Sequence, residues 1–303
     1  MIWLLLILIT LMAGAYLLAH VTLVPLSARK EVSLGQFVQL QDGETHFQWH
    51  GPETGPIIVC IHGLSTPSYA FAPLIPLLID QGYRVLSYDL YGRGGSDRVE
   101  GEQTREFFMR QLRELLASQG ITDRVTLLGY SMGGALATAR AVEAPETVNR
   151  LILLAPTGLG VELGRFYDLA AKLPYLGDWM MEVIGPLLSY WQYGRTTSDI
   201  PFEEDINAWI REDLRVEGAL EAILSSQRNF LSEDMAEDHM LIAKTGIPML
   251  VMWGEQDTVI PIEALTALRK INPKARHVIF DWADHRLPYL WPEDVAAAIE
   301  DNL

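Results

Sequence analysis

Ser131 is the first residue of this sequence whose surroundings point to chemistry. It lies at the centre of G-Y-S-M-G, residues 129–133, between an apolar strand-like run and a run of small residues typical of a helix. This G-x-S-x-G spacing is typical of a nucleophile elbow, a sharp strand-to-helix turn that exposes the serine hydroxyl. Glycines two positions to either side remove Cβ atoms that would collide with neighbouring elements. The pattern therefore predicts that Ser131 is a nucleophile, with a helix N-terminus nearby to favour developing negative charge.

A serine hydroxyl needs a general base, and the base needs an acid to orient it. Among seven histidines, His285 follows the last predicted strand, in a loop that returns to the carboxyl edge of the sheet, where ligands bind in open α/β folds. His277 begins that strand and is predicted to be structural. The loop after the preceding buried strand offers Asp257 and Glu255. We favour Asp257 as the acid and keep Glu255 as the alternative. Either choice gives the chain order Ser, Asp/Glu, His that accompanies the elbow.

Acyl transfer also needs N–H donors for the oxyanion. The segment C-I-H-G-L-S, residues 60–65, follows a predicted strand, and the backbone amides of Leu64 and Met132 are the predicted donors. Gly63 allows the close backbone approach, and His62 is predicted to support the loop by hydrogen bonding. Because no His, Cys or carboxylate cluster has metal-ligand spacing, the sequence predicts neither a metal nor an organic cofactor.

Eight short β-rich runs occur along the chain, and most of them are separated by helical patterns. The loops that join these elements would position the candidate residues. The first two runs flank a hairpin signal at Asp42-Gly43, and the later ones are continuous aliphatic runs suited to strands buried on both faces. Strands that alternate with helices imply right-handed βαβ units. The predicted fold is α/β, with a mostly parallel eight-stranded sheet flanked by helices. The runs lie at residues 36–40, 45–50, 57–61, 84–90, 124–130, 150–155, 248–253 and 277–281.

One stretch interrupts this alternation. Residues 158–245 show no convincing strand, are rich in aromatic and aliphatic residues, and in their second half carry far more acidic than basic side chains. We predict a helical cap there, apolar inside and acidic outside. The expected organisation is a first part of the core at 33–157, the cap at 158–245, and a second part of the core at 246–303.

Residues 1–27 are predicted to form an N-terminal transmembrane anchor. The segment carries no formally charged side chain through Leu26, and about 24 residues of helix reach about 36 Å, enough to cross a bilayer core of about 30 Å. A cleaved signal peptide and a helix docked on the protein are the alternatives, although no Lys or Arg precedes the apolar run as a signal peptide would have. Arg29 and Lys30 follow the segment directly and favour a cytoplasmic catalytic domain.

Composition excludes some classes of partner. The formal net charge of −16 and the pI near 4.8 argue against binding to nucleic acid, whose phosphates would be repelled. Cys60 is the only cysteine, so no intramolecular disulfide is possible, and its apolar neighbours predict a small buried hydrophobe. No nucleic-acid partner is therefore expected. The predicted serine nucleophile and oxyanion donors favour a small-molecule ester or lipid substrate, and the N-terminal helix favours a membrane.

Taken together, these motifs resemble the α/β-hydrolase fold superfamily. The matching pieces are HGLS (62–65), DLYGRGGSD (89–97), GYSMGG (129–134), WGEQDTVIP (253–261) and DHRLPYLWPEDV (284–295), in the family order. The resemblance implies a hydrolase core with a helical cap inserted after the sixth strand, and is strongest to single-domain esterases and monoacylglycerol lipases, some of which are membrane-tethered. Asp284 departs from the glycine that many relatives have before the catalytic histidine.

Ser131 at the nucleophile position separates the chain from haloalkane dehalogenases and epoxide hydrolases of this fold, which have Asp there, and HGLST differs from the HGGPG-like loop of proline iminopeptidases. The resemblance implies a serine hydrolase that cleaves carboxylic esters, with monoacylglycerols or medium-chain esters favoured. Carbon–carbon bond hydrolases of aromatic-ring breakdown share the S-M-G-G elbow and stay an alternative. A second alternative is a non-catalytic, membrane-tethered binding protein of the same fold.

Overall fold

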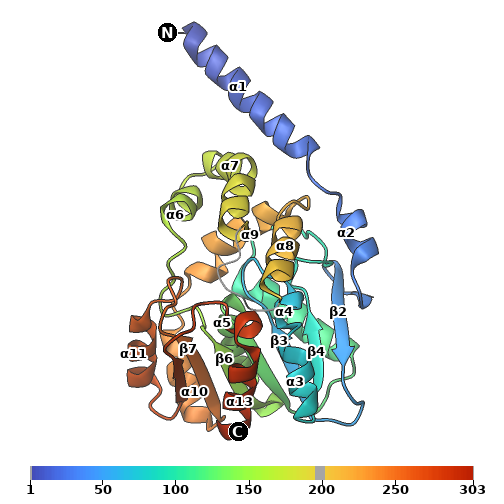
Figure 1. The fold of residues 1–303 in the computed structure, drawn as a ribbon, viewed down its shortest axis with the longest axis vertical. Helices are drawn as coiled ribbons and strands as arrows, with labels where there is room; N and C mark the ends of the chain where they lie inside the picture. The colour runs from blue at the N-terminus through green and yellow to red at the C-terminus, as the bar shows by residue number, and fades with distance from the viewer. Residues whose placement is uncertain (1, 195–201, 303) are drawn as a thin grey trace.

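The computed structural model describes residues 2–194 and 202–302, and it contains one eight-stranded sheet (Figure 1). The strand order is β1-β2-β4-β3-β5-β6-β7-β8. β1 pairs antiparallel with β2, and β2 with β4, whereas every later pair is parallel, as the sequence predicts. The strands are β1 (Gln36–Gln39), β2 (Glu44–His50), β3 (Ile57–Ile61), β4 (Arg84–Tyr88), β5 (Val125–Tyr130), β6 (Val148–Leu154), β7 (Met249–Gly254) and β8 (Arg276–Phe280).

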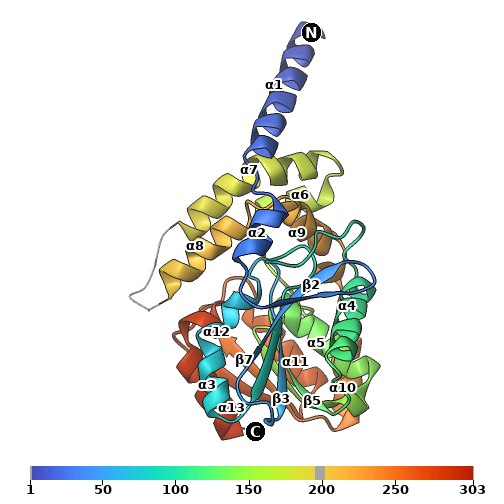
Figure 2. The ribbon, with the colours of Figure 1, turned by 90° about the vertical axis from the view of Figure 1, so that its right-hand side faces the viewer.

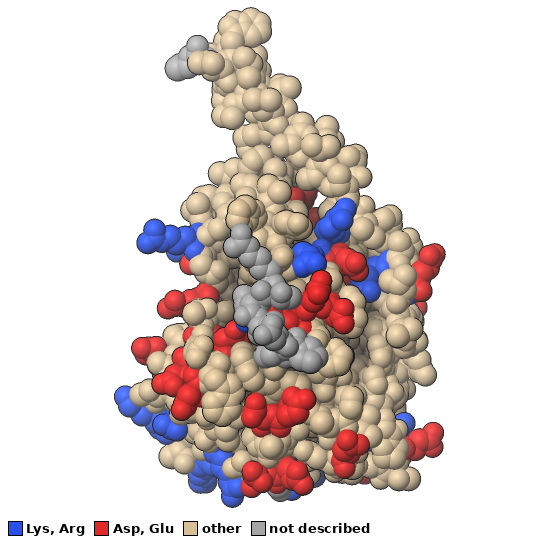
Figure 3. Space-filling model, viewed as in Figure 1, with Lys and Arg blue, Asp and Glu red and all other residues tan. Residues whose placement is uncertain are grey.

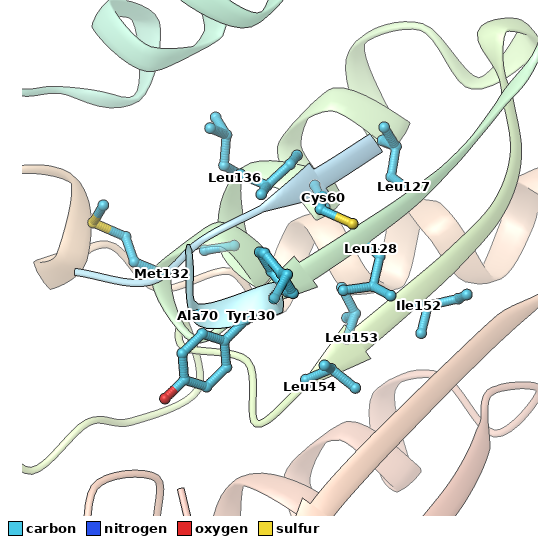
Figure 4. Close-up of a cluster of buried hydrophobic side chains, with 14 of the residues drawn as sticks. Cys60, Ala70, Leu127, Leu128, Tyr130, Met132, Leu136, Ile152, Leu153 and Leu154 are labelled. Carbon is cyan, nitrogen blue, oxygen red and sulfur yellow. The ribbon is translucent and has the colours of Figure 1, made fainter. Parts of the chain in front are cut away.

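The central strands are apolar because helices cover both of their faces. All residues of β5 and β7 are buried, and β3 and β6 are buried over most of their length. Cys60 has no exposed surface and lies on β3, beside Leu128 of β5 and among buried aliphatic side chains (Figure 4). The predicted role of this cysteine as a small buried hydrophobe agrees with that position.

Two helical layers flank the sheet (Figure 2). α3 and α13 pack on each other and on β4 and β7, whereas α5 packs on β3, β5 and β6 and in turn contacts α4 and α10. The helices of these layers are α3 (Leu74–Asp80), α4 (Arg105–Ser118), α5 (Met132–Glu143), α10 (Ala236–Thr245), α11 (Ile262–Ile271), α12 (Leu287–Leu290) and α13 (Pro292–Asn302). Short 3₁₀ turns lie at Ser68–Phe71, Pro145–Thr147 and Phe230–Ser232.

Local sequence sets the bounds of these helices. In α4 the Thr104 side chain accepts a hydrogen bond from the Phe107 amide and caps the N-terminus. Phe108 and Leu112 recur at helical spacing and are fully buried on the face that packs on the core. Gly120 follows the helix with a φ of 65°, a conformation that L side chains avoid, and so ends it.

Between β6 and β7 the described residues contain no strand apart from an isolated bridge of Val216 to Val24. They form the helices α6 (Arg165–Lys172), α7 (Leu176–Tyr193), α8 (Glu203–Asp213) and α9 (Ala219–Arg228) besides α10. The first four contact one another above the carboxyl edge of the sheet, where they are drawn in green, yellow and orange in Figure 1. α10 instead packs on α5 and α11. We therefore propose that the cap consists of α6–α9 and that α10 belongs to the core, which shortens the predicted 158–245 range at its end.

The N-terminal helix α1 (Ile2–Val21) projects from the rest of the protein (Figures 1 and 2). It is the one helix in the described residues that is long and apolar enough to cross a membrane, and none of its residues is buried. The following segment, with α2 (Leu26–Val32), returns to the folded body. There Arg29 pairs with Asp213 at 3.0 Å, and Lys30 pairs with Glu44 at 2.7 Å and with Asp97. Arg29 and Lys30, whose charges favour a cytoplasmic catalytic domain, thus also hold α2 to the folded body.

Two histidines are buried without charge. Burial lowers the pKa of His62 and of His239 to about 4. His239 lies on α10 with 1% of its surface exposed, and its Nδ1 has no hydrogen-bond partner in the described residues. An unfolded histidine has a pKa of about 6.5, so between those values the unfolded chain binds a proton that the folded chain excludes. Stability must therefore fall as the pH falls through this window.

We predict that His239→Phe reduces this acid sensitivity. Lowering the pH from about 7.5 to about 5 costs the wild type about 2 kcal/mol through this one side chain, and the variant loses that contribution. The measurement is the midpoint of thermal unfolding at both pH values for both proteins. An equal pH-induced drop in wild type and variant contradicts the prediction, and any pH-independent effect of the larger ring cancels in the comparison.

Candidate active site

Ser131 lies at the junction of β5 and α5 in a strained backbone conformation, with φ of 54° and ψ of −119°. The strain is held by hydrogen bonds on both sides of the residue. Its amide donates to the Leu154 carbonyl at the end of β6, and its carbonyl accepts from the amides of Gly134 and Thr157. Such a conformation costs on the order of 1–3 kcal/mol and persists only where the surroundings impose it. The turn leaves the Ser131 hydroxyl facing the cavity described below.

The glycines of the elbow permit the close packing that creates it. A Cβ at Gly129 would lie 2.4 Å from the Gly133 carbonyl oxygen, and a Cβ at Gly133 would lie 2.1 Å from the Ile61 carbonyl oxygen. Real Cβ atoms do not approach backbone oxygens so closely. α5 therefore begins against the end of β3, next to the 62–65 loop.

His285 and Asp257 meet Ser131 at the carboxyl edge of the sheet. The Ser131 hydroxyl lies 3.0 Å from His285 Nε2, and Asp257 Oδ2 lies 2.8 Å from His285 Nδ1. The other carboxylate oxygen of Asp257 accepts from the amides of Val259 and Ile260 at 2.7 and 2.8 Å. A carboxylate on Nδ1 fixes the tautomer that leaves the Nε2 lone pair toward the serine. The structure thus brings together the three side chains that the sequence predicted, whereas Glu255 is exposed.

Close packing of the loops after β7 and β8 brings Asp257 to His285. A Cβ at Gly254 would lie 2.4 Å from the Ala283 carbonyl oxygen, so only glycine allows this approach. The Gln256 amide donates to that same oxygen at 2.9 Å. These contacts fix the two loops against each other, although the acid and the base are 28 positions apart in the sequence.

His62 fixes the peptide that carries the Leu64 amide. Its ring is fully buried, accepts from the Leu90 amide at Nε2 (2.8 Å) and lies 2.8 Å from the Gly63 carbonyl oxygen at Nδ1. Because the first contact requires a bare Nε2, Nδ1 carries the proton and donates to Gly63. A trans peptide points its C=O and N–H in opposite directions. The Leu64 N–H thus points away from the buried ring, on the loop that lines the cavity.

Arg93 holds the same loop from the other side and was not recognised from the sequence. Its guanidinium is 1% exposed and donates to the Leu64 carbonyl at 2.9 Å and to Ser226 on α9 at 2.8 Å. It also bonds the side chain of Gln103. Burial lowers the pKa of Arg93 to about 9. Arg93 belongs to the DLYGRGGSD motif, which could have drawn attention to it. Only the fold shows that it joins the 62–65 loop to α9, over 120 residues away in the sequence.

A cavity of about 460 Å³ lies over Ser131 and His285. One part of its wall comes from the 63–66 loop and from residues around His285, and the other comes from the helices inserted between β6 and β7. The apolar members of the second wall are Leu163, Tyr167, Met181, Leu214, Leu220 and Ile223.

Arg286, the one lysine or arginine among the described lining residues, is already paired. Its guanidinium lies 2.6 Å from Glu203 on α8, a carboxylate with no exposed surface, and 2.7 Å from Asp284. The unusual Asp284 before the histidine is thus neutralised by the residue after it. The two carboxylates raise the pKa of Arg286 beyond its normal range although burial opposes them. Arg286 therefore stays positively charged and remains part of the cavity wall.

No group of three or more His, Cys, Asp or Glu side chains in residues 2–194 and 202–302 has the arrangement needed to hold a metal ion. The groups that the described residues place at the site are an oriented hydroxyl, an imidazole, a carboxylate, and N–H groups near the start of α5.

Comparison with known proteins identifies relatives of the whole catalytic region. A family profile described as "alpha/beta hydrolase fold" matches residues 56–289, which is more than half of the chain. A 2-hydroxy-6-oxononadienedioate/2-hydroxy-6-oxononatrienedioate hydrolase of Cupriavidus pinatubonensis is 27% identical over 273 residues, covering 84% of this chain and 90% of that protein. Lipase 1 of Psychrobacter immobilis is 26% identical over 244 residues, covering 78% and 73%.

Solved structures share the architecture. An esterase from Exiguobacterium antarcticum superposes with a TM-score of 0.73 at 20% identity, covering 88% of this chain and 98% of that one. At this level of identity the likeness concerns the fold alone. Together with the family match and the observed eight-stranded, mostly parallel sheet, this likeness confirms the fold expected from the sequence.

We predict that Gly133→Ala disrupts the elbow. The new methyl group would meet the Ile61 carbonyl at a distance that forces backbone movement, and we expect a loss of stability of about 3 kcal/mol or more. Gly82→Ala is the control, because no atom lies within 4 Å of the new Cβ and its only penalty is a φ of 88°, a backbone strain that Gly133, inside α5, does not have. The control should lose only about 1–2 kcal/mol. Chemical unfolding measures both, and equal losses would show that the contact at Gly133 is unimportant.

Proposed function

Because this chain belongs to the α/β-hydrolase fold family, we propose that it is a serine hydrolase that cleaves carboxylic esters through an acyl-enzyme. The observation that carries the proposal is the continuous hydrogen-bonded series from Asp257 through His285 to Ser131, at 2.8 and 3.0 Å. Each group is in the relation that nucleophilic catalysis by serine requires.

The proposed reaction proceeds in two halves. His285 Nε2 takes the hydroxyl proton as Ser131 Oγ attacks the ester carbonyl carbon, and the proton then passes to the departing alcohol oxygen. Asp257 stabilises the imidazolium formed between these transfers. Water next attacks the acyl-enzyme, His285 accepts its proton and returns it to Ser131 Oγ, and the carboxylic acid is released.

We assign stabilisation of the oxyanion to the amides of Leu64 and Met132. The Leu64 amide is supported by the peptide orientation that His62 imposes. The Met132 amide is the first of α5, whose dipole favours negative charge at this end. Neither amide has an acceptor among the residues that the structure describes. Donors held ready before the reaction are usually the largest single contribution to catalysis of this kind.

We favour monoacylglycerols or medium-chain esters as substrates. The inserted segment supplies the aliphatic lining that an acyl chain requires, through Leu163, Met181, Leu214, Leu220 and Ile223. Polar lining groups come from the same segment, among them Asn207, Gln192 and Gln227, and from Ser65 and Gln256 outside it. A lipase among the relatives is consistent with this class. The proposed anchoring of α1 in a membrane would place the site where such substrates are concentrated.

Carbon–carbon bond hydrolysis is the second candidate, because two relatives are named as hydrolases of 2-hydroxy-6-oxo dienoic acids, one a dienedioate and one a 6-(2'-aminophenyl)hexa-2,4-dienoic acid. The first of these compounds carries two carboxylates and the second carries one. The one guanidinium among the described lining residues, Arg286, is already neutralised by Glu203 and Asp284. An uncharged ester does not require a free cation, so the electrostatics of the cavity favour the ester.

We predict that Ser131→Ala lowers turnover of monoacylglycerols and p-nitrophenyl esters by roughly 10⁶ and abolishes labelling by a fluorophosphonate probe. Ser65→Ala is the control, because Ser65 lines the same cavity outside the elbow and its hydroxyl lies 3.4 Å from that of Tyr193. The control should keep probe labelling and most of its activity.

Activity of Ser131→Ala within about tenfold of wild type would refute the assignment of the nucleophile. Wild-type protein that neither labels nor hydrolyses any ester would favour a binding protein. A ring-cleavage dienoate assayed in the same panel tests the second candidate, and faster turnover of that compound than of every ester would replace the first.

Asp257→Asn is predicted to lower turnover by about 10⁴, since an amide no longer holds the productive tautomer of His285. Glu255→Gln is its matched control, two residues away in the same loop and exposed. The measurement is the kcat of both variants on one ester. If the glutamine variant is the impaired one, the acid is Glu255 and not Asp257.

A further inference from the structure

α7 carries an apolar stripe that is exposed at both ends of the helix and half-buried in its middle, at Met180 and Val183. Residues at helical spacing along this side are Leu176, Met180, Val183, Leu187 and Tyr190. Leu187 and Tyr190 are 64% and 67% exposed. At the start of the helix, the elbow between α6 and α7 adds Tyr175, which is 90% exposed. Single exposed apolar residues are ordinary, but a set of this length marks a surface that contacts something.

α1 indicates what that surface contacts, because it packs beside α7. The Trp179 indole donates to the Met12 carbonyl at 3.0 Å, and the Tyr16 hydroxyl lies 3.5 Å from the Glu182 carboxylate. These contacts are on the side of α7 next to the stripe. In Figures 1 and 2, α6 and α7 lie at the end of the body from which α1 projects.

The contact at Met12 fixes how far α7 reaches along α1. Met12 lies nine residues before the end of α1 at Val21, which corresponds to about 13 Å of helix. The whole of α1 is about 30 Å long, the thickness of a bilayer core. When α1 spans a membrane, the start of α7 cannot remain in bulk water. Tilting of α1 changes only the depth in the bilayer that the start of α7 reaches.

We propose that α7 is an interfacial helix whose apolar stripe, with the α6–α7 elbow, lies in the near leaflet of the bilayer that α1 spans. The composition fits this position. Tyr175 and Tyr190 are of the type enriched at membrane interfaces, and the exposed Arg165 and Lys172 on α6 are long enough to reach lipid head groups. Acidic side chains are spread over the face of the body below α1 in Figure 3, and none lies on α1 itself.

The opposite side of α7 lines the active-site cavity through Met181, Ser189 and Tyr193. α7 is thus a wall one helix thick between lipid and the Ser131 hydroxyl. The inference rests on the anchor proposed above for α1, and it is independent of the ester chemistry.

The test uses the full chain reconstituted in phosphatidylcholine vesicles, with one cysteine introduced at a time and labelled with a fluorophore. Native Cys60 is fully buried and stays unlabelled, so wild-type protein gives the background. Tyr175→Cys and Leu187→Cys report on the elbow and the stripe, Leu5→Cys reports on the anchor, and Glu300→Cys is an exposed control on α13. Brominated acyl chains quench from the lipid side, and iodide quenches from water.

We expect labels at positions 175 and 187 to be quenched by brominated lipid several-fold more than the label at 300, and to be protected from iodide. Iodide quenching at 175 and 187 equal to that at 300 overturns the proposal. If the label at position 5 is in lipid in that case, the interfacial helix is wrong and the anchor stands. If that label is also in water, the anchor itself is wrong. Protection from both quenchers at 187 would mean that protein covers the stripe, which also overturns the proposal.

Discussion

The contact between the start of α5 and the end of β3 is the constraint on which the rest of the site depends. With a hydrogen atom in place of a side chain at Gly133, the helix begins against the Ile61 carbonyl. This position forces the sharp turn at Ser131 and brings the 62–65 loop beside it. The strained serine is then held by hydrogen bonds to its carbonyl and amide, so its conformational cost is offset before any substrate arrives.

Hydrogen-bonded polar groups buried beneath the site also keep it rigid. Asp89 accepts hydrogen bonds from His46 and from the amides of Ser68 and Gly95, and although burial opposes ionisation, these partners hold the pKa of Asp89 well below its usual range. The loop that carries the Leu64 amide lies on this base. Catalytic groups supported by such satisfied networks keep their geometry without needing substrate to order them.

The core and the candidate triad could be predicted because their signals are local. Continuous aliphatic runs gave the parallel strands, and the glycine spacing around Ser131 gave the elbow, while His285 and Asp257 followed from their places after predicted strands. The contacts of Arg93 with α9 and of Arg29 with Asp213 join positions more than 130 residues apart. No pattern along the chain specifies which of many charged residues will meet, so these contacts appear only once the helices are placed.

The contacts of the Arg93 guanidinium limit how the helices above the sheet can be exchanged for those of a relative. Because the guanidinium bonds Leu64 and Ser226 at once, transplanting foreign helices would remove the Ser226 acceptor and leave this deeply enclosed cation with its bonds to Leu64, Tyr91 and Gln103 alone. A chimaera without a replacement acceptor would lose the direct tie between the loop over the serine and α9, even with every reacting group retained. Successful recombination thus has to treat Arg93 and its partner on α9 as one inherited unit.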